Sequence, residues 1–347
     1  MRNVLEPTIK DIAKICGVGV STVSRAINNH PDINPETKQK ILDTIQEYGY
    51  VPNDSARNLK RSDAKAIAVL IKGISNSFFT NMIQVIEKEC KRKNYIMQLS
   101  HVEADEDEVN VAQKVVKEKR LRGIIFLGGL FSHSEEKLSK LNVPFVFSTV
   151  GSIPENISRN LYSSISVDDR LESAKMVEYL INSGHIRIAI LVAEAQEQSI
   201  SKLRLEGYYD TLKAHNIAID PNLICHTNDA LSHFSMENGY LSTKKLLARG
   251  ESFTALYAVS DSLAIGALRA LHEAGLRVPE DISLAGYDGI DMTNYIVPSL
   301  TTIRQPVEKM AKDTTKLLFD IISGKREHQH ITYPAELVIR ESTRQRE

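Results

Sequence analysis

The segment 8–28, TIKDIAKICGVGVSTVSRAIN, carries side chains whose types and spacing suit contacts with DNA bases. Its apolar residues recur at helical spacing on both sides of a break at Gly17 and Gly19, which predicts two short helices joined by a turn. At about 100° per residue, the buried side of the second helix carries Val23, Ala26 and Ile27. The opposite side carries Ser21, Arg25 and Asn28. Such a helix can enter a major groove, although a helical hairpin with no role in DNA binding fits the same pattern.

Polar and aromatic residues also follow several predicted strands. In an α/β protein, ligands bind at the carboxyl ends of strands. The segments expected there are 75–79, 149–150, 193–204, 260–261 and 288–289. Their rings, arginine and carboxylates suit a polyhydroxylated ligand, because rings cover C–H surfaces and charged groups bind hydroxyls. Each residue also has a structural alternative: Asp261 and Asp288 as helix caps, Phe79 as core, and Arg204 in a surface ion pair.

No catalytic or cofactor motif accompanies these residues. The sequence has no GxxxxGK[ST] phosphate loop, no GxGxxG after a strand, no HExxH and no GxSxG. Its ten histidines are scattered, and its three cysteines are far apart with no CxxC pair, which argues against disulfides and structural zinc. We therefore predict no catalytic residue, no cofactor and no metal.

A third helix should complete a small N-terminal bundle. Asn34 and Pro35 are typical of a helix start, and an apolar stripe of Ile41, Ile45 and Tyr48 would close the core. The segment 53–60 that follows could form one or two helical turns. Because so short and polar a helix is not stable alone, this segment by itself is typical of a linker.

From residue 66 onward, apolar strands alternate with helices. Strands are predicted at 66–71, 96–100, 123–128, 143–149, 165–167, 186–192, 254–260, 282–288, 301–306 and 331–339. Helices are predicted at 79–93, 106–119, 170–183, 199–215, 237–248, 262–275 and from the end of strand 301–306 through residue 323. Because these strands are continuous apolar runs, we expect parallel sheets covered on both faces, in two α/β units.

Length and charge are compatible with this organisation. A chain of 347 residues is too long for one core and suits two or three domains. Residues 1–62 carry nine Lys or Arg and seven Asp or Glu within a chain of net charge −1, so affinity for phosphates would depend on placement and dimerisation. The N-terminus has no apolar signal region, and no stretch approaches about 18 apolar residues. We expect a cytoplasmic, unanchored protein.

Taken together, these motifs resemble the LacI/GalR family of bacterial transcription regulators. The similarity runs in order along essentially the whole chain, through segment 8–28 and then YGYVPNDSARNLK, SNSFF, LINSGHIRIAIL, LRLEGYYDTL, SDSLAIGALRAL, GLRVPEDISLAGYDG and PSLTTIRQP. It implies an N-terminal three-helix helix-turn-helix headpiece plus an α/β periplasmic-binding-protein-like core of two parallel-sheet subdomains. The implied domains are a headpiece at 1–52, a hinge helix at 53–62 and a core at 63–347. Within that core, the implied N-subdomain is 63–163 and 297–325, and the implied C-subdomain is 164–296 and 326–342.

The resemblance also implies which residues contact DNA. Base contacts fall on Val20, Ser21 and Arg25, with Arg25 on a guanine and Val20 on a thymine methyl, and phosphate contacts on Thr22 and Ser24. Gly19 departs from the family, where a capping side chain is usual. The hinge contributes Ala56, Leu59 and Lys60, with Leu59 as a wedge in the minor groove at the operator centre.

The implied effector contacts are Phe78, Phe79, Gln198, Arg204, Phe234, Asp261 and Asp288, with a sugar or sugar derivative expected and a nucleobase as the alternative. The sequence thus predicts a homodimeric, nucleoid-associated repressor that binds a palindromic DNA operator. Its affinity would be controlled by a small ligand in the cleft between the subdomains. An enzyme is disfavoured by the missing catalytic groups. A periplasmic-type sugar-binding protein would share the core, but the helical headpiece argues against it.

Overall fold

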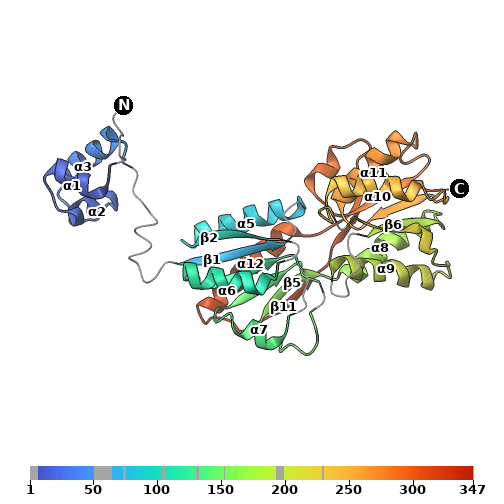
Figure 1. Cartoon of the computed structure of the whole chain (residues 1–347), viewed down its shortest axis with the longest axis horizontal. Coiled ribbons are helices and arrows are strands. Elements are labelled where there is room, and N and C mark those ends of the chain that lie inside the picture. Colours follow the sequence, from blue (N-terminus) through green and yellow to red (C-terminus); the bar gives the residue numbers. More distant parts are fainter. Residues whose placement is uncertain are drawn as a thin grey trace. The chain divides into compact units, whose positions relative to one another are not determined.

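The computed structural model describes residues 7–50, 65–72, 76–103, 106–129, 133–151, 153–192, 199–228 and 230–346. The chain divides into two compact units, residues 1–64 and 65–347. The first unit is helical where it is described, and the second alternates strands with helices (Figure 1). The predicted hinge at 53–62 lies outside the described residues.

The headpiece consists of α1 (Ile9–Cys16), α2 (Val20–Ile27) and α3 (Pro35–Glu47). Its buried core is formed by Ile12, Ala13, Cys16, Val23, Ala26 and Ile41, which confirms the predicted inner faces of the first two helices. The prediction for Tyr48 was wrong, since its side chain is 48% exposed. α3 ends one residue earlier, and after the turn at Gly49 it is Tyr50 that packs against the core.

The first lobe of the second unit is built on a six-stranded sheet. Its strands are β1 (Ala66–Lys72), β2 (Ile96–Val102), β3 (Gly123–Leu127), β4 (Phe145–Ser148), β5 (Ser163–Val167) and β11 (His330–Tyr333), in the order β11-β5-β4-β3-β1-β2. Its helices are α5 (Phe78–Arg92), α6 (Glu108–Lys119), α7 (Glu135–Ser139) and α12 (Val307–Ile322).

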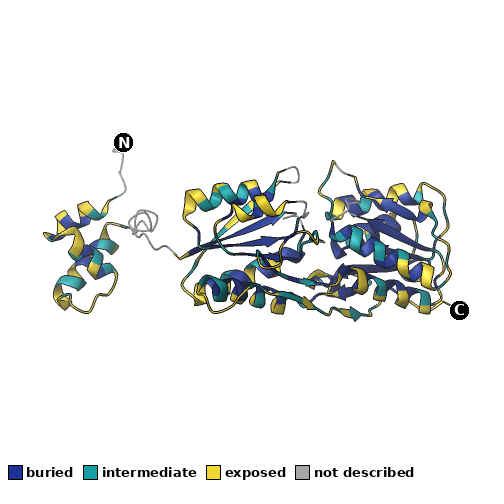
Figure 2. Ribbon diagram, turned by 90° about the horizontal axis from the view of Figure 1, so that it is seen from below, coloured by how far each residue is buried: buried dark blue, intermediate teal, exposed yellow. Residues whose placement is uncertain are grey.

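Both faces of the central strands β1, β3 and β4 of this first sheet are buried, as a parallel sheet requires. Along β1, Ile67, Val69 and Ile71 face a cluster that includes residues of α5 and α12. The alternate residues Ala66, Ala68 and Leu70 face a second cluster with residues of α6 and α7. Figure 2 shows the resulting pattern of dark blue strands between helices with exposed outer faces.

The second lobe has its own six-stranded sheet. Its strands are β6 (Ile188–Val192), β7 (Ile224–His226), β8 (Ala255–Ala258), β9 (Ser283–Asp288), β10 (Thr301–Arg304) and β12 (Glu336–Val338), in the order β12-β10-β9-β8-β6-β7. Its elements also include α8 (Asp169–Asn182), α9 (Ile200–Ala214), α10 (Met236–Leu247), α11 (Asp261–Glu273) and the 3-10 turns η1 (Pro221–Leu223) and η2 (Asp291–Asn294). α8 and α9 lie on one side of β6, with α10 and α11 on the other (Figure 1).

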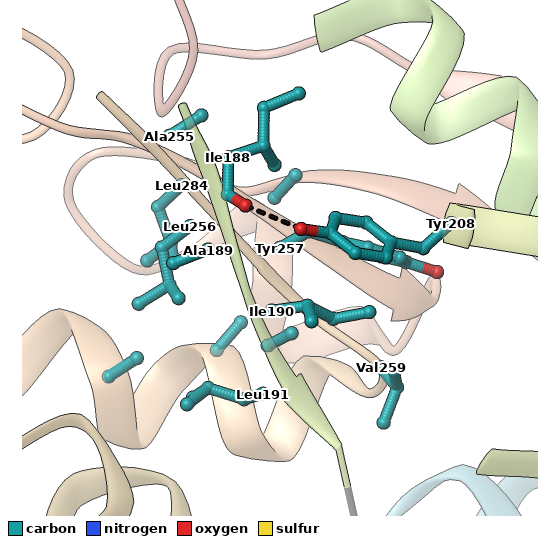
Figure 3. Close-up of a cluster of buried hydrophobic side chains, with 14 of the residues drawn as sticks. Ile188, Ala189, Ile190, Leu191, Tyr208, Ala255, Leu256, Tyr257, Val259 and Leu284 are labelled. Atoms are coloured by element: carbon teal, nitrogen blue, oxygen red, sulfur yellow. Dashed lines mark hydrogen bonds between the residues drawn. The ribbon is translucent and has the colours of Figure 1, made fainter. Parts of the chain in front are cut away.

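The core of the second lobe is a single apolar cluster between these helix pairs. β6 and β8 supply its centre, where Tyr208 of α9 lies among aliphatic side chains and donates its hydroxyl to the Ile188 carbonyl at 2.8 Å (Figure 3). Because a buried tyrosine hydroxyl needs a partner, this bond fixes α9 against the start of β6.

The chain crosses between the lobes three times, and each predicted subdomain boundary needs correction. β5 lies entirely in the first sheet rather than being split at 164. β10 pairs with β9 in the second sheet, although residues 297–325 were assigned to the N-subdomain. The predicted strand 331–339 is two strands in different sheets, since β11 pairs with β5 and β12 with β10. A strand hydrogen-bonds along its length to one sheet, so the crossings fall in the links after residues 167, 304 and 333.

Candidate DNA-binding and effector sites

The first helix of the headpiece is capped at both ends by its own sequence. Thr8 accepts from the backbone N–H of Asp11 at 3.4 Å, and Asp11 accepts from the backbone N–H of Thr8 at 2.8 Å, which is a capping box. Gly17 ends α1 in the left-handed region at φ +69°, a conformation that costs glycine little. These caps fix the turn that leads into α2.

The exposed face of α2 carries the predicted DNA contacts. Val20 is 41% exposed, Ser21 and Arg25 are exposed, and Thr22 and Ser24 are half-buried beside them. Within the described headpiece, α2 starts at Gly19 with no side-chain cap. Gly19 therefore offers no side chain to the first-turn N–H groups of α2. Those of Thr22 and Val23 donate to the Gly19 carbonyl at 2.9 and 3.2 Å, and backbone N–H groups at a helix start are suited to phosphate.

Arg25 has an anionic neighbour that the sequence analysis did not single out. Its Nη1 lies 3.1 Å from Oδ2 of Asp32, in the turn before α3. The other contacts predicted for DNA binding, Ala56, Leu59 and Lys60, lie outside the described residues.

In the second unit, Arg204 of α9 is the centre of a buried polar cluster. It is 3% exposed, which excludes the surface ion pair considered as its alternative role. Its Nη2 lies 2.8 Å from Asp169 Oδ1, and its Nη1 donates to the Val259 carbonyl at 2.5 Å. The guanidinium carbon lies 3.6 Å from the centre of the Tyr287 ring. The arginine is thus held rigidly by a carboxylate, a carbonyl and a ring.

Asp288, the last residue of β9, completes this cluster. Its Oδ1 lies 3.4 Å from Arg204 Nη1 and accepts from Gln305 Nε2 at 3.0 Å. Its Oδ2 is buried and has no hydrogen-bond partner within 3.5 Å among the described residues, although the side chain of Asn76 is near enough to lower the pKa of Asp288. Burial raises the pKa of Asp288 to about 6, against the lowering effect of Arg204 and Gln305. Asp288 also has φ +117°, an unusual conformation for a residue with a side chain, and such strain collects at functional sites.

Asp261 stands close to Asp288 but is already fully bonded within the protein. One carboxylate oxygen accepts from the backbone N–H groups of Gly289 and Ile290 at 2.7 and 2.8 Å, and the other accepts from Thr302 at 2.6 Å. Burial and the neighbouring Asp288 raise its pKa well above the ordinary value. Asp261 therefore holds the turn after β9. The cap of α11 is its neighbour Ser260.

The aromatic residues predicted to contact the effector lie in different surroundings. Phe78 and Phe79 begin α5 and stack edge to face at 5.5 Å, inside a first-lobe cluster that also contains Ile290 of the second lobe. Phe79 is thus also a core residue, as its alternative role required. Phe234 is half-buried on the second-lobe core, and Gln198 lies outside the described residues.

Two members of the polar cluster were missed by the sequence analysis. Asp169 opens α8 just after β5, and Gln305 follows β10. Both lie at carboxyl ends of strands, so strand-end position was the available signal. The predicted strand 165–167 ends where β5 ends, but Asp169 was not included among the strand-end segments, and the predicted strand 301–306 extended past Gln305.

The described residues contain no group of three or more His, Cys, Asp or Glu that could hold a metal ion. Among those same residues, no helix is long and apolar enough to cross a membrane.

A helix-turn-helix headpiece joined to a two-lobed α/β core with a buried polar cluster defines a transcription regulator that binds DNA and responds to a small molecule. Two family models match this chain: bacterial regulatory proteins of the lacI family at residues 8–53, and the periplasmic binding protein-like domain at residues 177–343. The chain belongs to the LacI family of bacterial regulatory proteins. This confirms the resemblance and the fold class inferred from the sequence.

Relatives and solved structures match over nearly the whole length. The HTH-type transcriptional regulator MalR of Clostridium butyricum is 40% identical, over 96% of this chain and 98% of that protein. A PurR repressor of Histophilus somni is 31% identical, over 97% of this chain and 99% of that protein. A CelR–cellobiose complex has a TM-score of 0.70 at 26% identity, covering 97% and 99% of the chains. The lac repressor dimer bound to operator has a TM-score of 0.72 at 25% identity, and the match covers 98% of this chain and 99% of that chain.

Proposed function

We propose that this regulator is a cytoplasmic homodimeric repressor whose effector is a carbohydrate bound between Arg204, Asp288 and the rings of Phe78, Phe79 and Phe234. The observation that carries the proposal is Asp288 Oδ2, which is buried beside a fixed arginine and has no hydrogen-bond partner within 3.5 Å among the described residues. A buried acceptor without a donor costs free energy, and a sugar hydroxyl would supply the missing donor. A relative named as a ribose operon repressor and a neighbour solved with cellobiose support this class of ligand.

We propose fewer effector-contacting residues than the sequence suggested. Asp261 has its oxygens occupied by protein donors, so we assign it to positioning of Gly289 and Ile290 rather than to ligand contact. Asn76, which follows β1 in the first lobe, lowers the pKa of Asp288 in the second. A ligand at Asp288 would therefore meet both lobes, which is the arrangement needed for a ligand to alter how the lobes meet.

Effector binding is tested by calorimetric titration of the full chain with monosaccharides, disaccharides, sugar phosphates and nucleobases. We expect saturable binding of a carbohydrate that is lost in Asp288→Ala and retained in Ser183→Ala, a buried polar substitution outside the cluster. Binding of a nucleobase alone would contradict the carbohydrate assignment. Recovery of a chemically altered ligand would contradict a purely regulatory role.

We further propose that the operator is contacted by Val20, Ser21 and Arg25 at base edges and by Thr22 and Ser24 at phosphates. The exposed face of α2 and its separation from the buried Val23 and Ala26 support this assignment. The hinge residues Ala56, Leu59 and Lys60 would add minor-groove contacts when two copies bind. Selection from a randomised duplex library, followed by a gel-shift assay, tests the proposal. A preference for a two-fold symmetric sequence is expected, and equal affinity for random duplex would overturn it.

Homodimer formation has its own support on the surface of the second lobe. Apolar side chains are exposed in η2 and in the residues that follow it: Tyr295 is 76% exposed and Val297 is 89% exposed. Beside them is a surface groove of about 700 Å³ lined by Leu268, His272, Val278, Val297 and Pro298, among others. Exposed apolar surface of this kind marks interaction sites, and we assign a second copy of this chain to it. We call residues 292–298 and the α11 face beside them the dimer patch.

A further inference from the structure

The base-contacting arginine proposed above belongs to a chain of three polar groups at the end of the recognition helix. Arg25 Nη1 lies 3.1 Å from Asp32 Oδ2, with the two side chains 58% and 50% exposed. The other oxygen of Asp32, Oδ1, lies 2.7 Å from Nδ1 of His30. The hydrogen bond to His30 holds the pKa of Asp32 below its ordinary value. The carboxylate is therefore ionised at neutral pH and is held from both sides.

The backbone places Asp32 there through a tight helix ending. The N–H of His30 donates to the carbonyl of Arg25 at 3.0 Å, and the N–H of Asn29 donates to the carbonyl of Ala26 at 3.1 Å. Asn29 has φ +53°. These two hydrogen bonds, together with the left-handed conformation of Asn29, form a Schellman motif. It turns the chain back under the last turn of α2, and the ammonium group of Lys38 on α3 fixes the turn by donating to the side chain of Asn29.

Such a neighbour affects specific and non-specific DNA binding in opposite directions. A guanidinium carries five N–H donors in a planar fork. If Nη1 is occupied by Asp32, other donors of the fork can still approach the O6 and N7 atoms of a guanine. A side chain already held in one orientation loses less conformational freedom on binding. The same carboxylate repels DNA phosphates, so it does not increase the affinity of the headpiece for DNA of unrelated sequence.

We propose that Asp32 is a specificity-determining positioning residue, which orients Arg25 for one base pair of the operator and contacts no base itself. This inference rests on the proposed DNA contact of Arg25. His30 supports Asp32 through the carboxylate oxygen that Arg25 does not contact. The alternative is an incidental surface ion pair, and exposed pairs often contribute nothing to stability. The decisive property is therefore base discrimination rather than stability.

The test uses the full chain and the two-fold symmetric duplex that the wild-type protein selects from a randomised library. Single base-pair changes in that duplex identify the position whose discrimination falls most in Arg25→Ala, and some discrimination at that position must remain in this variant for the double-variant comparison. Asp32→Ala and Asp32→Asn are then compared at that position by competition gel shift. Asp43→Asn is the matched control. It removes one carboxylate from the exposed face of α3, where Asp43 accepts from Gln39 rather than from an arginine.

We expect both Asp32 variants to lose about two- to fivefold of the discrimination at that base pair, the range for an exposed charge pair. Affinity for unrelated duplex should stay equal or rise in these variants and in Asp43→Asn, since each loses one negative charge. In the Arg25→Ala background, Asp32→Ala should cause no further loss at that position.

Unchanged discrimination in Asp32→Ala with normal helical circular dichroism would overturn the positioning role. A further loss in the Arg25→Ala background would also overturn it, because Asp32 would then act on the DNA without Arg25. Failure of the wild-type protein to select any sequence would instead refute the proposed operator contacts. The two failures are thus distinguishable.

Discussion

At the scale of single residues, charge and burial separate the two sites. Arg25 on the headpiece is largely exposed, whereas Arg204 in the core is buried and held by Asp169 and a carbonyl. An exposed arginine that is bonded to one carboxylate still has donors that a base edge can reach, because its fork carries five N–H groups. A buried arginine with fixed partners is a rigid part of the site. In the proposed effector site it would present donors to a ligand without first having to be ordered.

Arg25→Ala should remove discrimination at one operator base pair by about 1–3 kcal/mol, since a bidentate contact to guanine contributes about that much. Competition gel shifts with single-base variants of the operator measure this. Thr22→Ala provides the comparison, because loss of a phosphate contact weakens binding to all duplexes about equally. Full sequence preference in the Arg25 variant would show that another face of the headpiece contacts the bases.

Asp288→Asn should change how stability depends on pH. The folded carboxyl has a pKa of about 6 against an ordinary value of 3.8. Between these values the folded state binds more protons than the unfolded state, so wild-type stability falls as pH rises through this window. The stability of the variant relative to the wild type should therefore increase by up to about 3 kcal/mol from pH 4 to pH 7. Urea denaturation across that range measures it, and parallel pH profiles would contradict the raised pKa.

At the scale of elements, local signals in the sequence predicted more than long-range pairing did. Asn34 and Pro35 mark a helix start through chemistry within three residues, and the structure has that cap. The predicted β2 run suggested a strand buried on both faces. β2 is instead an edge strand with Ile96 and Leu99 exposed. Nothing in a short apolar run distinguishes a central strand from an edge strand, because pairing depends on elements far away in the chain.

The candidate sites show the same division. The helical wheel placed Ser21 and Arg25 on the exposed face of α2, because a period of 3.6 residues is a local property. It could not bring Asp32 to Arg25, since that contact depends on the left-handed turn at Asn29. In the core, strand ends indicated Arg204 and Asp288 as ligand contacts, and the structure places Arg204 Nη1 3.4 Å from Asp288 Oδ1. The split of residues 331–339 into two strands in different sheets was not predictable from hydrophobicity, because β11 and β12 are both half-buried.

Gly266→Ala should disrupt the packing of α10 against α11. A Cβ at this position would lie 1.9 Å from the carbonyl oxygen of Met236 and 2.6 Å from the backbone nitrogen of Tyr240. Alanine is otherwise the better helix former, so any loss reflects the clash. We expect destabilisation of more than about 2 kcal/mol by urea denaturation. Gly250→Ala, which meets no atom within 4 Å but has φ +74°, should cost only about 1 kcal/mol. Equal losses would point to backbone strain rather than helix contact.

The hinge gives a further prediction at the same scale. In Leu59→Ala, specific operator binding should weaken while the fold of the core is unchanged, because the proposed apolar wedge no longer separates the central base step. Gel shifts and thermal denaturation of the same preparations measure the two properties. Lys325→Ala is a suitable control, since this exposed residue lies in the other unit. Unchanged operator affinity would exclude the wedge.

At the scale of the whole molecule, repression under ligand control requires that ligand binding in the core change DNA binding by the headpieces. The chain crosses between the lobes three times, so a ligand held by both lobes biases their relative arrangement. A ligand shifts such an equilibrium only by its difference in affinity for the two arrangements, which is typically worth about 1–3 kcal/mol. A single headpiece contacts only one half of a two-fold symmetric site, so the shift in lobe arrangement cannot change its preference for the whole site. Two headpieces joined through their cores can, because the second binding step becomes intramolecular.

Val297→Asp should therefore separate dimerisation from folding. Val297 is 89% exposed in the single chain, so a charge there leaves the monomer stable, whereas burial of that charge in the dimer patch has no compensating partner. We expect the dimer dissociation constant to rise at least about tenfold, or about 1.4 kcal/mol, with a parallel loss of operator affinity at low protein concentration. Sedimentation velocity and gel shifts over a concentration series measure both. Ile186→Asp is the matched control, since Ile186 is 68% exposed and lies outside the patch. A Val297 variant that stays dimeric, or equal dissociation of both variants, would place the contact between copies on another surface.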